Sequence, residues 1–283
     1  MKRAIVTGAR GFIGKRLVDE LRSRGCEVAE IDIGDNADEL SGEWDVMFNL
    51  AWVGKGGALR ADYNVQMSNV KLGLDFYRQA QRLKCGRYVC TGTIGEKMSR
   101  LPECSHIKSQ NLIYAISKNY LHDILNTIGD ESCKVVWATL GNIYGNKDAG
   151  GNIVDYCLRK ILVGDKAEFG PAEQPYDFIH VDDVVRAIAE IGLGDAVKSG
   201  EFYVGSGTPK PLKEYLMEIG NLAGRLDLIG IGCRKDDGTR YRAEWFDISA
   251  LREECLFEPR ISFEEGIKGN IDSLSGVCNG DRS

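Results

Sequence analysis

A tyrosine and a lysine four residues apart are the first side chains in this sequence whose types and spacing could carry out proton chemistry. Tyr114 and Lys118 stand in the segment Tyr-Ala-Ile-Ser-Lys, and residues four apart share one face of a helix. An ammonium group near a phenol favours the ionised phenol, whose ordinary pKa is about 10. The pair could therefore act as a general acid and base, although chance alone places a solvated lysine beside a tyrosine in many helices.

Three glycines near the start of the chain could cradle a phosphate group. Gly8, Gly11 and Gly14 follow the apolar residues 4–6 and open a segment whose apolar side chains recur at helical spacing. We expect Gly8 to form a tight turn, Gly11 to let the backbone approach a pyrophosphate, and Gly14 to let helix and strand pack closely. Amides at the N-terminus of the helix would face the negative charge. Three other residues of this turn are expected to contact the cofactor that carries this phosphate. They are Arg10, Phe12 and Ile13.

A carboxylate follows the glycines at the distance typical of dinucleotide-binding proteins. The helical pattern stops at Gly25, and residues 27–32 form a second short apolar-rich run that ends at Asp32. Strand, glycine turn, helix and strand therefore follow one another, with an acid about twenty residues after the glycines. Asp32 would accept hydrogen bonds from ribose hydroxyls and repel a 2′-phosphate, which predicts NAD as the cofactor.

Alternating strands and helices must position these residues. The predicted helices are 62–83 and 111–128, and the predicted strands are 45–51, 87–91 and 134–140. Such alternation implies right-handed crossovers and an α/β fold, a Rossmann-type doubly wound parallel sheet. Ligands of such sheets bind beyond the carboxyl ends of the strands. Leu50, Ala51 and Thr91 stand at such ends and are expected there.

Composition excludes several classes of protein. The 283 residues, 43% of them apolar, can bury a large core. A formal net charge of -6, with no dense run of Lys and Arg, argues against a nucleic-acid partner. No apolar stretch approaches the roughly 18 residues of a membrane span, and the apolar residues 4–6 are too few for a signal peptide. We therefore expect a cytoplasmic enzyme with no membrane partner.

Cysteine and histidine provide no metal-binding pattern. The nine cysteines are odd in number, lack a C-x-x-C pair and stand mostly in apolar stretches, which predicts reduced core residues. His106, His122 and His180 show no paired spacing, so no metal site is expected. The cysteines are Cys26, Cys85, Cys90, Cys104, Cys133, Cys157, Cys233, Cys255 and Cys278.

Motifs spread over nearly the whole length are similar to those of one family. They are TGARGFIG at 7–14, NLAW at 49–52 where the family usually has HLAA, CTGTIG at 90–95, YAISK at 114–118, GNIYG at 141–145, DFIHVDDVVRAI at 177–188, FYVGSG at 202–207 and PRISFEEGI at 259–267. The chain resembles an extended short-chain dehydrogenase/reductase of the NAD-dependent epimerase/dehydratase type. The resemblance implies a nucleotide-sugar substrate.

The resemblance assigns roles to the catalytic candidates. It makes Tyr114 the general acid/base and Lys118 the residue that lowers its pKa and holds the nicotinamide ribose. Thr91 would hydrogen-bond the reacting sugar oxygen, with Thr93 as the rival hydroxyl; either could instead satisfy a turn amide. Asn69 is either the family's buried asparagine near the active-site helix or a polar residue of a helix surface.

The second half of the chain is expected to supply the substrate lobe. We expect residues 1–145 to form the dinucleotide-binding core and 146–283 the lobe, with segments near 176–205 returning to the core. Asn142 is the preferred substrate contact. Arg240 and Arg242 are possible phosphate clamps, although solvated surface charges are the commoner case.

Departures from the family pattern narrow the chemistry. Gly92 and Thr93 stand where family dehydratases have an Asp-Glu pair, which argues against dehydration. Tyr176 and Thr139 replace family arginines, so the carrier group of the substrate stays open. Arg10 occupies a place that favours NADP in some relatives, and NADP is therefore the less favoured alternative to NAD.

The resemblance leaves three functions to consider. The first is oxidation and reduction at C4 of a nucleotide-linked sugar, by a 4-epimerase or a 4-ketoreductase. The others are reduction of a small carbonyl compound and non-catalytic dinucleotide sensing. Many relatives pair through the two helices that correspond to 62–83 and 111–128, which predicts a homodimer.

Overall fold

The computed structural model describes residues 1–102, 110–145, 151–198 and 200–280, without the side chains of residues 110–111 and 276–280. Cys104, His106 and the side chain of Cys278 therefore lie outside the described residues. Backbone proximity divides the chain into two units. The first unit comprises Met1–Leu140, Val184–Val204 and Asp247–Glu258, and the second comprises Gly141–Asp183, Gly205–Phe246 and Pro259–Ser283.

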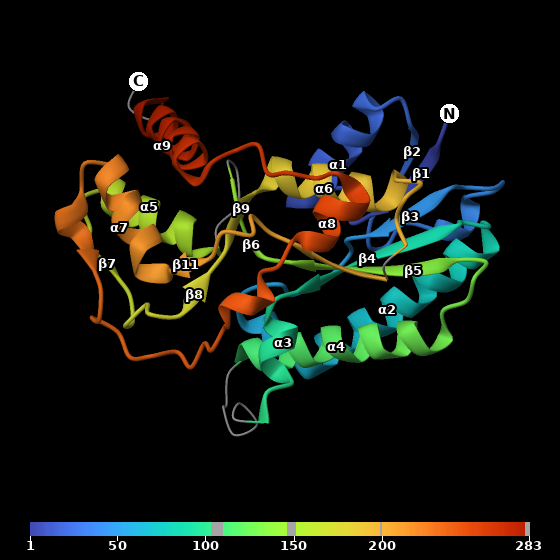
Figure 1. Ribbon diagram of the computed structural model, residues 1–283, viewed down its shortest axis with the longest axis horizontal. Helices are drawn as coiled ribbons and strands as arrows, with labels where there is room; N and C mark the ends of the chain where they lie inside the picture. Colours follow the sequence, from blue (N-terminus) through green and yellow to red (C-terminus); the bar gives the residue numbers. More distant parts are fainter. Residues whose placement is uncertain (103–109, 146–150, 199, 281–283) are drawn as a thin grey trace. The chain divides into compact units, whose positions relative to one another are not determined.

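A six-stranded sheet forms the centre of the first unit (Figure 1). The strands are β1 (Arg3–Thr7), β2 (Glu27–Ile31), β3 (Val46–Asn49), β4 (Arg87–Thr93), β5 (Lys134–Leu140) and β10 (Glu201–Val204). Their order is β10-β5-β4-β3-β1-β2, and every pairing is parallel. The chain switches direction across the sheet between β1 and β3, where such folds bind ligands. The predicted Rossmann-type α/β fold is confirmed.

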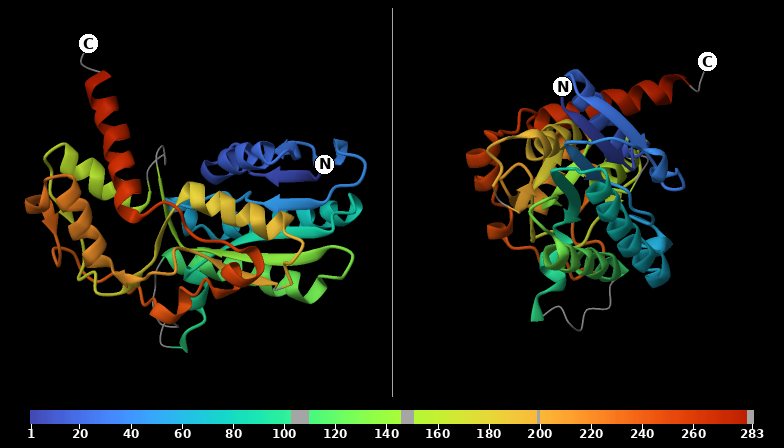
Figure 2. Two further views of the ribbon diagram at one scale, coloured as in Figure 1. Left: turned by 45° about the horizontal axis from the view of Figure 1, so that its top comes forward. Right: turned by 90° about the vertical axis from the view of Figure 1, so that its right-hand side faces the viewer.

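Helices cover both faces of this sheet (Figures 1 and 2). One face carries α1 (Phe12–Ser23) and α6 (Val181–Leu193), and the other carries α2 (Tyr63–Arg82) and α4 (Gln110–Ile128). All four residues of β3 are buried, as a strand covered on both faces requires. Two short helices that the sequence did not predict, α3 (Gly95–Ser99) and α8 (Ser249–Cys255), complete this unit.

Local signals explain where the helices of the first unit begin and end. Gly25 has φ +78°, and the amides of Gly25 and Cys26 bond to the carbonyls of Arg22 and Leu21, which is the Schellman ending of a helix. Asp62 caps α2, because its carboxylate accepts the amides of Asn64 and Val65.

The second unit has its own apolar core. Its helices are α5 (Ile153–Leu162), α7 (Leu212–Leu222) and α9 (Phe263–Gly280). Its strands form pairs: β6 (Asn142–Tyr144) with β9 (Phe178–His180), β7 (Ala167–Glu168) with β12 (Ile229–Gly230), and β8 (Pro175–Tyr176) with β11 (Lys210–Pro211). Leu158, Leu216 and Ile267 bring the three helices into one cluster of buried side chains.

Cysteines and helices of the described residues can be compared with the composition of the chain. Most cysteines that the structure describes are buried and all are free, with Cys233 as an exposed exception. Within the described ranges, no three histidine, cysteine or carboxylate side chains gather as a metal site would need. Every helix described is too short or too polar to span a lipid bilayer.

Candidate active site

The glycine turn between β1 and α1 is closed tightly by its own backbone. Gly8 has φ +69°, and a Cβ there would lie 2.8 Å from the amide nitrogen of Ala51. At Gly14 a Cβ would lie 2.1 Å from the carbonyl oxygen of Gly8. Neither position therefore tolerates a side chain. Gly11 precedes α1 without a side-chain cap, which leaves the first amides of the helix available to an anion.

A cavity of about 200 Å³ lies within the first unit and brings most of the predicted site together. The glycine turn, the residues after the strands and helix α4 all contribute to its wall. Its predicted residues are Gly8, Gly11, Phe12, Ile13, Gly14, Asp32, Leu50, Ala51, Thr91, Tyr114 and Lys118. The sequence did not single out Ile33, Trp52, Lys55, Gly92 and Leu140 for this wall.

Lys118 connects the helix that carries Tyr114 to the strand that carries Thr91. Its Nζ atom donates a hydrogen bond to the backbone oxygen of Thr91 at 2.7 Å and lies 6.0 Å from the centroid of the Tyr114 ring. The same Nζ lies 3.8 Å from the ring centroid of Trp52. The buried ammonium is thus held by a carbonyl and an aromatic face, both of which favour a cation.

Tyr114 stands between an indole ring and a guanidinium group. Trp52 meets its ring edge to face, with the centroids 5.8 Å apart, and the guanidinium carbon of Arg60 lies 4.0 Å from its centroid. Burial raises the pKa of Tyr114 to about 12, while the charge of Arg60 lowers it. Burial also lowers the pKa of Lys118. Both Trp52 and Arg60 were missed, because they come from a glycine-rich loop without periodic pattern.

The two candidate threonines have different surroundings. Thr91 lines the cavity, and its hydroxyl donates to the backbone oxygen of Asn49 at 3.2 Å. Thr93 is not among the residues that line the cavity, and its hydroxyl accepts the amide of Gly95 at 3.5 Å. Thr93 therefore satisfies a turn amide, which is the structural role considered for both threonines.

Glu96 is a buried carboxylate beneath the end of β4 that the sequence did not mark as functional. Its Oε1 accepts the amide of Thr93 at 2.5 Å, and its Oε2 accepts the indole N–H of Trp137 at 3.0 Å. Burial raises the pKa of this carboxyl. A Cβ on Gly92 would lie 2.2 Å from Nε1 of Trp137, so the glycine makes room for this contact.

Asn69 does not line the cavity. It is buried in α2, where its Oδ1 accepts the amide of Val53 and its Nδ2 donates to the carbonyl of Val53, both at 2.9 Å. The residue therefore holds the backbone beside Trp52. Its burial agrees with the interpretation as the family's buried asparagine. Its described hydrogen bonds, however, go to the loop that contains Val53.

Asp32 and Arg10 contact each other, although the sequence predicts that they favour different cofactors. The backbone amide of Arg10 donates to Oδ2 of Asp32 at 2.9 Å, and Nε of Arg10 lies 3.4 Å from the same oxygen. Nη2 of Arg10 lies 2.6 Å from Asp35, and Arg10 is not among the residues of the cavity wall. Asp32 does line the cavity.

The residues present fit a dinucleotide. The closed glycine turn leaves backbone, not side chain, at the start of α1, and uncapped amides suit a pyrophosphate. Asp32 borders the same cavity, as a ribose-binding carboxylate would. Thr91, Tyr114 and Lys118 border the cavity as well, so proton chemistry is possible beside a dinucleotide bound there.

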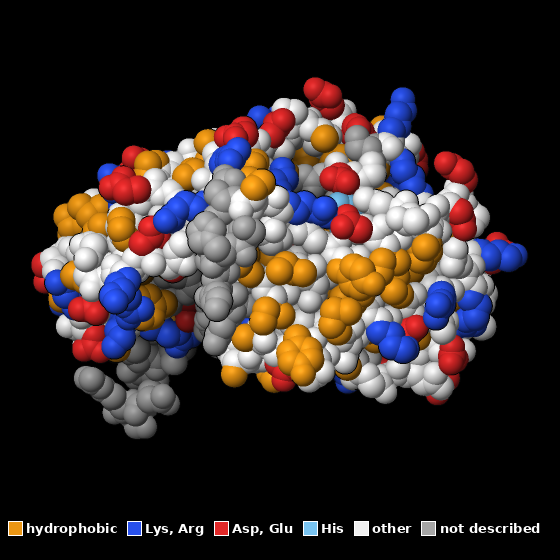
Figure 3. All heavy atoms as spheres, turned by 90° about the horizontal axis from the view of Figure 1, so that it is seen from below, with side chains coloured by type: hydrophobic (Ala, Val, Ile, Leu, Met, Phe, Trp, Pro, Cys, Tyr) orange, Lys and Arg blue, Asp and Glu red, His pale blue; other side chains and the backbone are white. Residues whose placement is uncertain are grey.

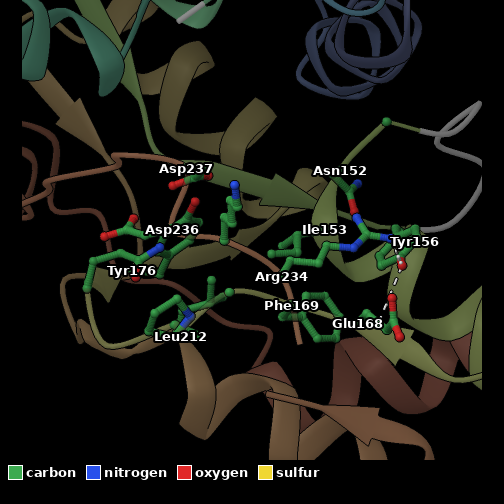
Figure 4. A pocket seen from close by; sticks show the side chains of 16 residues that line it. Asn152, Ile153, Tyr156, Glu168, Phe169, Tyr176, Leu212, Arg234, Asp236 and Asp237 are labelled. Carbon is green, nitrogen blue, oxygen red and sulfur yellow. Dashed lines mark hydrogen bonds between the residues drawn. The ribbon is translucent and has the colours of Figure 1, made fainter. Parts of the chain in front are cut away.

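A separate cavity of about 340 Å³ lies within the second unit (Figure 4). Arg234 reaches along its wall toward Tyr156, donating from Nη2 to the phenol oxygen at 2.6 Å. Phe169 and Tyr176 add aromatic faces, and Lys235 adds a second cation.

The predicted substrate residues of the second unit lie elsewhere. Arg240 pairs with Asp236 at 2.7 Å, and Arg242 lies 5.9 Å from the ring centroid of Trp245. Neither arginine lines the cavity of this unit, so Arg234 is the arginine that the sequence missed. Asn142 is outside that wall too, and its buried Oδ1 has no hydrogen-bond partner among the described residues.

Known proteins resemble this chain over nearly its full length. A model of the NAD dependent epimerase/dehydratase family matches residues 4–204. A CDP-abequose synthase from Salmonella muenchen is 21% identical, covering 94% of this chain and 96% of that protein. A UDP-N-acetyl-alpha-D-glucosaminuronate decarboxylase from Bacillus cytotoxicus is 24% identical, covering 98% of this chain and 99% of that protein.

Solved structures share the fold. A UDP-N-acetylglucosamine 4-epimerase from Methanobrevibacter ruminantium, in complex with UDP-N-acetylmuramic acid, has a TM-score of 0.80 at 18% identity. The alignment covers 98% of this chain and 99% of that one. At this identity the likeness establishes the fold alone.

Proposed function

Since this chain belongs to the NAD dependent epimerase/dehydratase family and is an enzyme acting on nucleotide sugars, we propose that it interconverts a hydroxyl and a keto group at C4 of the sugar. One observation carries the proposal: Thr91, Tyr114 and Lys118 line the same cavity as the glycine turn. A protein that only senses a dinucleotide has no need of such a triad. Gly92 and Thr93, in the places of a dehydratase's two acids, argue against loss of water.

The cofactor proposed for the cavity is NAD. The amides at the start of α1 would hold its pyrophosphate, Asp32 its adenosine ribose and Lys118 its nicotinamide ribose. When bound, the nicotinamide supplies the hydride donor or acceptor that no side chain provides. NADP is less favoured, because the carboxylate of Asp32 would repel its 2′-phosphate.

Tyr114 moves the proton that accompanies the hydride. Its raised pKa of about 12 means that the phenol holds its proton at neutral pH and can donate it to a carbonyl oxygen during reduction. In the opposite direction the phenolate accepts the proton of the sugar hydroxyl. The positive charge of Arg60 stabilises that phenolate. The hydroxyl of Thr91, at the same wall, orients the sugar oxygen.

The cavity of the second unit is proposed to bind a nucleotide. Aromatic faces of Tyr156, Phe169 and Tyr176 suit a base, and Arg234 and Lys235 suit a diphosphate. Arg240 is less suited to this role, because its guanidinium already pairs with Asp236.

A homodimer is proposed through α2 and α4. Apolar side chains gather on the face of the molecule seen in Figure 3, and five exposed ones belong to these helices. They are Tyr63, Met67, Ile116, Tyr120 and Ile128. Exposed apolar patches on helices often mark contacts between proteins.

A two-stage experiment tests the function. Thermal shift with UDP-, dTDP-, CDP- and GDP-sugars identifies the carrier, and the best ligand is then prepared with deuterium at C4. If the enzyme is an epimerase, the label stays in the sugar after transient transfer to bound cofactor. If it is a ketoreductase running in reverse, the label appears in free NADH. Loss of the label to solvent without transfer to nicotinamide would contradict oxidation at C4.

A further inference from the structure

We propose that Asp35 sets the preference of this enzyme for NAD over NADP, by binding the guanidinium of Arg10 and withholding it from a 2′-phosphate. The proposal rests on the NAD-dependent function proposed above. It concerns a residue that belongs to none of the sequence motifs and follows the ribose-binding position by three residues.

The guanidinium of Arg10 lies between two carboxylates. Its Nη2 atom lies 2.6 Å from Oδ2 of Asp35, and its Nε atom lies 3.4 Å from Oδ2 of Asp32. The pairing raises the pKa of Arg10, and the hydrogen bond that Arg10 donates to Asp35 is the largest cause of that rise. Asp35 is therefore the principal partner of this arginine.

Backbone hydrogen bonds hold the carboxylate of Asp35 in place. Its Oδ2 accepts the amide of Asp32 at 2.7 Å, which is also the largest cause of its lowered pKa. The amide of Asp35 in turn donates to the carbonyl of Asp32 at 3.0 Å. The turn from 32 to 35 thus presents Asp35 to Arg10 in a fixed position, and the arginine adapts to it.

The carboxylate of Asp32 is oriented by backbone amides other than its own. Its Oδ2 accepts the amide of Arg10 at 2.9 Å and its Oδ1 accepts the amide of Ile33 at 2.8 Å. The two acids therefore have separable tasks. Asp32 offers its remaining lone pairs to ribose hydroxyls. Asp35 instead forms an ion pair with Arg10, the only arginine of the glycine turn.

The summed formal charge of three side chains determines whether a 2′-phosphate is repelled. Arg10, Asp32 and Asp35 together carry a charge of minus one, which repels a phosphate dianion. Without the charge of Asp35 the sum is zero, and the fork of the guanidinium can pair with phosphate oxygens. Arg10 is well placed for this change, because its side chain is 63% exposed.

The test measures binding rather than turnover. Wild type and Asp35→Asn are titrated with NADH and with NADPH, using nicotinamide fluorescence to obtain each Kd. We expect wild type to bind NADH more tightly, and Asp35→Asn to bind NADPH about tenfold more tightly than wild type does, with the NADH Kd changed less than about twofold. The gain should shrink at high salt, since these charges are exposed.

Matched variants separate this effect from a general loss of negative charge. Asp38→Asn removes a nearby carboxylate that contacts Gln79, and its ratio of Kd values should equal that of wild type. Adding Arg10→Gln to Asp35→Asn should abolish the gain in NADPH affinity. Asp35→Ser, whose hydroxyl can still accept the amide of Asp32, should reproduce the gain if Asp35→Asn is poorly folded.

The outcomes distinguish this proposal from the proposed function. An unchanged ratio in both folded Asp35 variants, with wild type binding NADH, overturns the role of Asp35 and leaves the function standing. Wild type that prefers NADPH overturns both the NAD assignment and the role of Asp35. Wild type that binds neither dinucleotide contradicts the proposed function itself.

Discussion

The guanidinium carbon of Arg60 lies 4.0 Å from the centroid of the Tyr114 ring, which places a second cation beside the proposed acid/base. Lys118, the partner expected from the sequence, has its Nζ at 6.0 Å from that centroid and donates its hydrogen bond to Thr91. The charge nearest to the tyrosine ring therefore comes from a loop, and not from the residue four positions along its own helix.

Removal of the charge of Arg60 should move the pH profile of the enzyme. A cation stabilises the phenolate, so Arg60→Gln raises the pKa of Tyr114 further. Oxidation of the sugar needs the phenolate, and its rate should rise at a pH about one unit higher than in wild type. Reduction needs the phenol and should persist to a correspondingly higher pH.

Profiles of kcat/KM in both directions measure this shift. Lys71→Gln, which removes an exposed cation from α2, serves as the control and should leave the profile in place. If Arg60→Gln and Lys71→Gln give the same profile as wild type, Arg60 does not tune Tyr114.

Tyr114→Phe should retain the fold and the cofactor but lose proton transfer. We expect kcat to fall by at least about 10², the low end for removal of a positioned acid or base. Tyr120→Phe changes an exposed tyrosine on the same helix and should leave kcat unaltered. Thermal unfolding and NADH titration establish that both variants are folded. Normal turnover by Tyr114→Phe would remove this residue from the mechanism.

Glu96 should make stability depend on pH. Its pKa is raised in the folded protein, so the folded state binds this proton more tightly than the unfolded state does. The resulting stabilisation is full below the ordinary pKa of 4.5 and is lost as pH rises through the raised value. Glu96→Gln cannot titrate, so the free energy of unfolding of wild type should fall relative to it as pH rises.

Urea unfolding at about pH 4.5, 6 and 7.5 measures this difference, which should change by about 1.4 kcal/mol for each unit by which the pKa is raised. Glu131→Gln alters an exposed carboxylate and is the control. A constant difference between wild type and Glu96→Gln across this range would show that Glu96 has no raised pKa.

Gly14→Ala should destabilise the glycine turn. Its new methyl group would lie 2.1 Å from the carbonyl oxygen of Gly8, and backbone must shift to admit it. We expect a loss of at least about 2 kcal/mol in the free energy of unfolding, together with weaker NADH binding. Gly86→Ala places its methyl group 3.7 Å from the nearest neighbour, the carbonyl of Asp45, and should cost less than about 1 kcal/mol. Equal stability of the two variants would contradict the role of Gly14.

Two charges on the outer face of α2 and α4 should dissociate the proposed homodimer. Met67→Glu combined with Tyr120→Glu buries like charges at the expected contact, whereas Met217→Glu charges an exposed apolar residue of α7. Sedimentation velocity at micromolar concentration should show a dimer for wild type and Met217→Glu, and a monomer for the double variant. A monomeric wild type would rule the homodimer out.

Residues within one local motif could be predicted from the sequence. Gly8 and Gly14 stand in a turn whose steric needs act over a few residues, and Tyr114 and Lys118 are related by the period of a helix. The parallel sheet followed from alternation of helices and strands, and it placed Thr91 at the end of a strand. Short-range geometry is sufficient for each of these inferences.

Contacts between remote segments required the tertiary structure. Trp52 and Arg60 approach Tyr114 from a loop whose path depends on how Asn69 in α2 holds Val53. Nothing in the spacing of these residues specifies that approach.

The sequence by itself determined the fold class, the glycine turn and the proposed acid/base, because turn geometry and helical period operate between near neighbours. Only the tertiary structure decided which charges surround them. Arg10 was a candidate for phosphate binding until Asp35 was seen to hold it, and Arg240 until Asp236 was. The sequence did not identify Arg60, whose guanidinium lies beside the ring of Tyr114. Pairing of charges depends on distances of a few ångströms between side chains, and packing sets these distances.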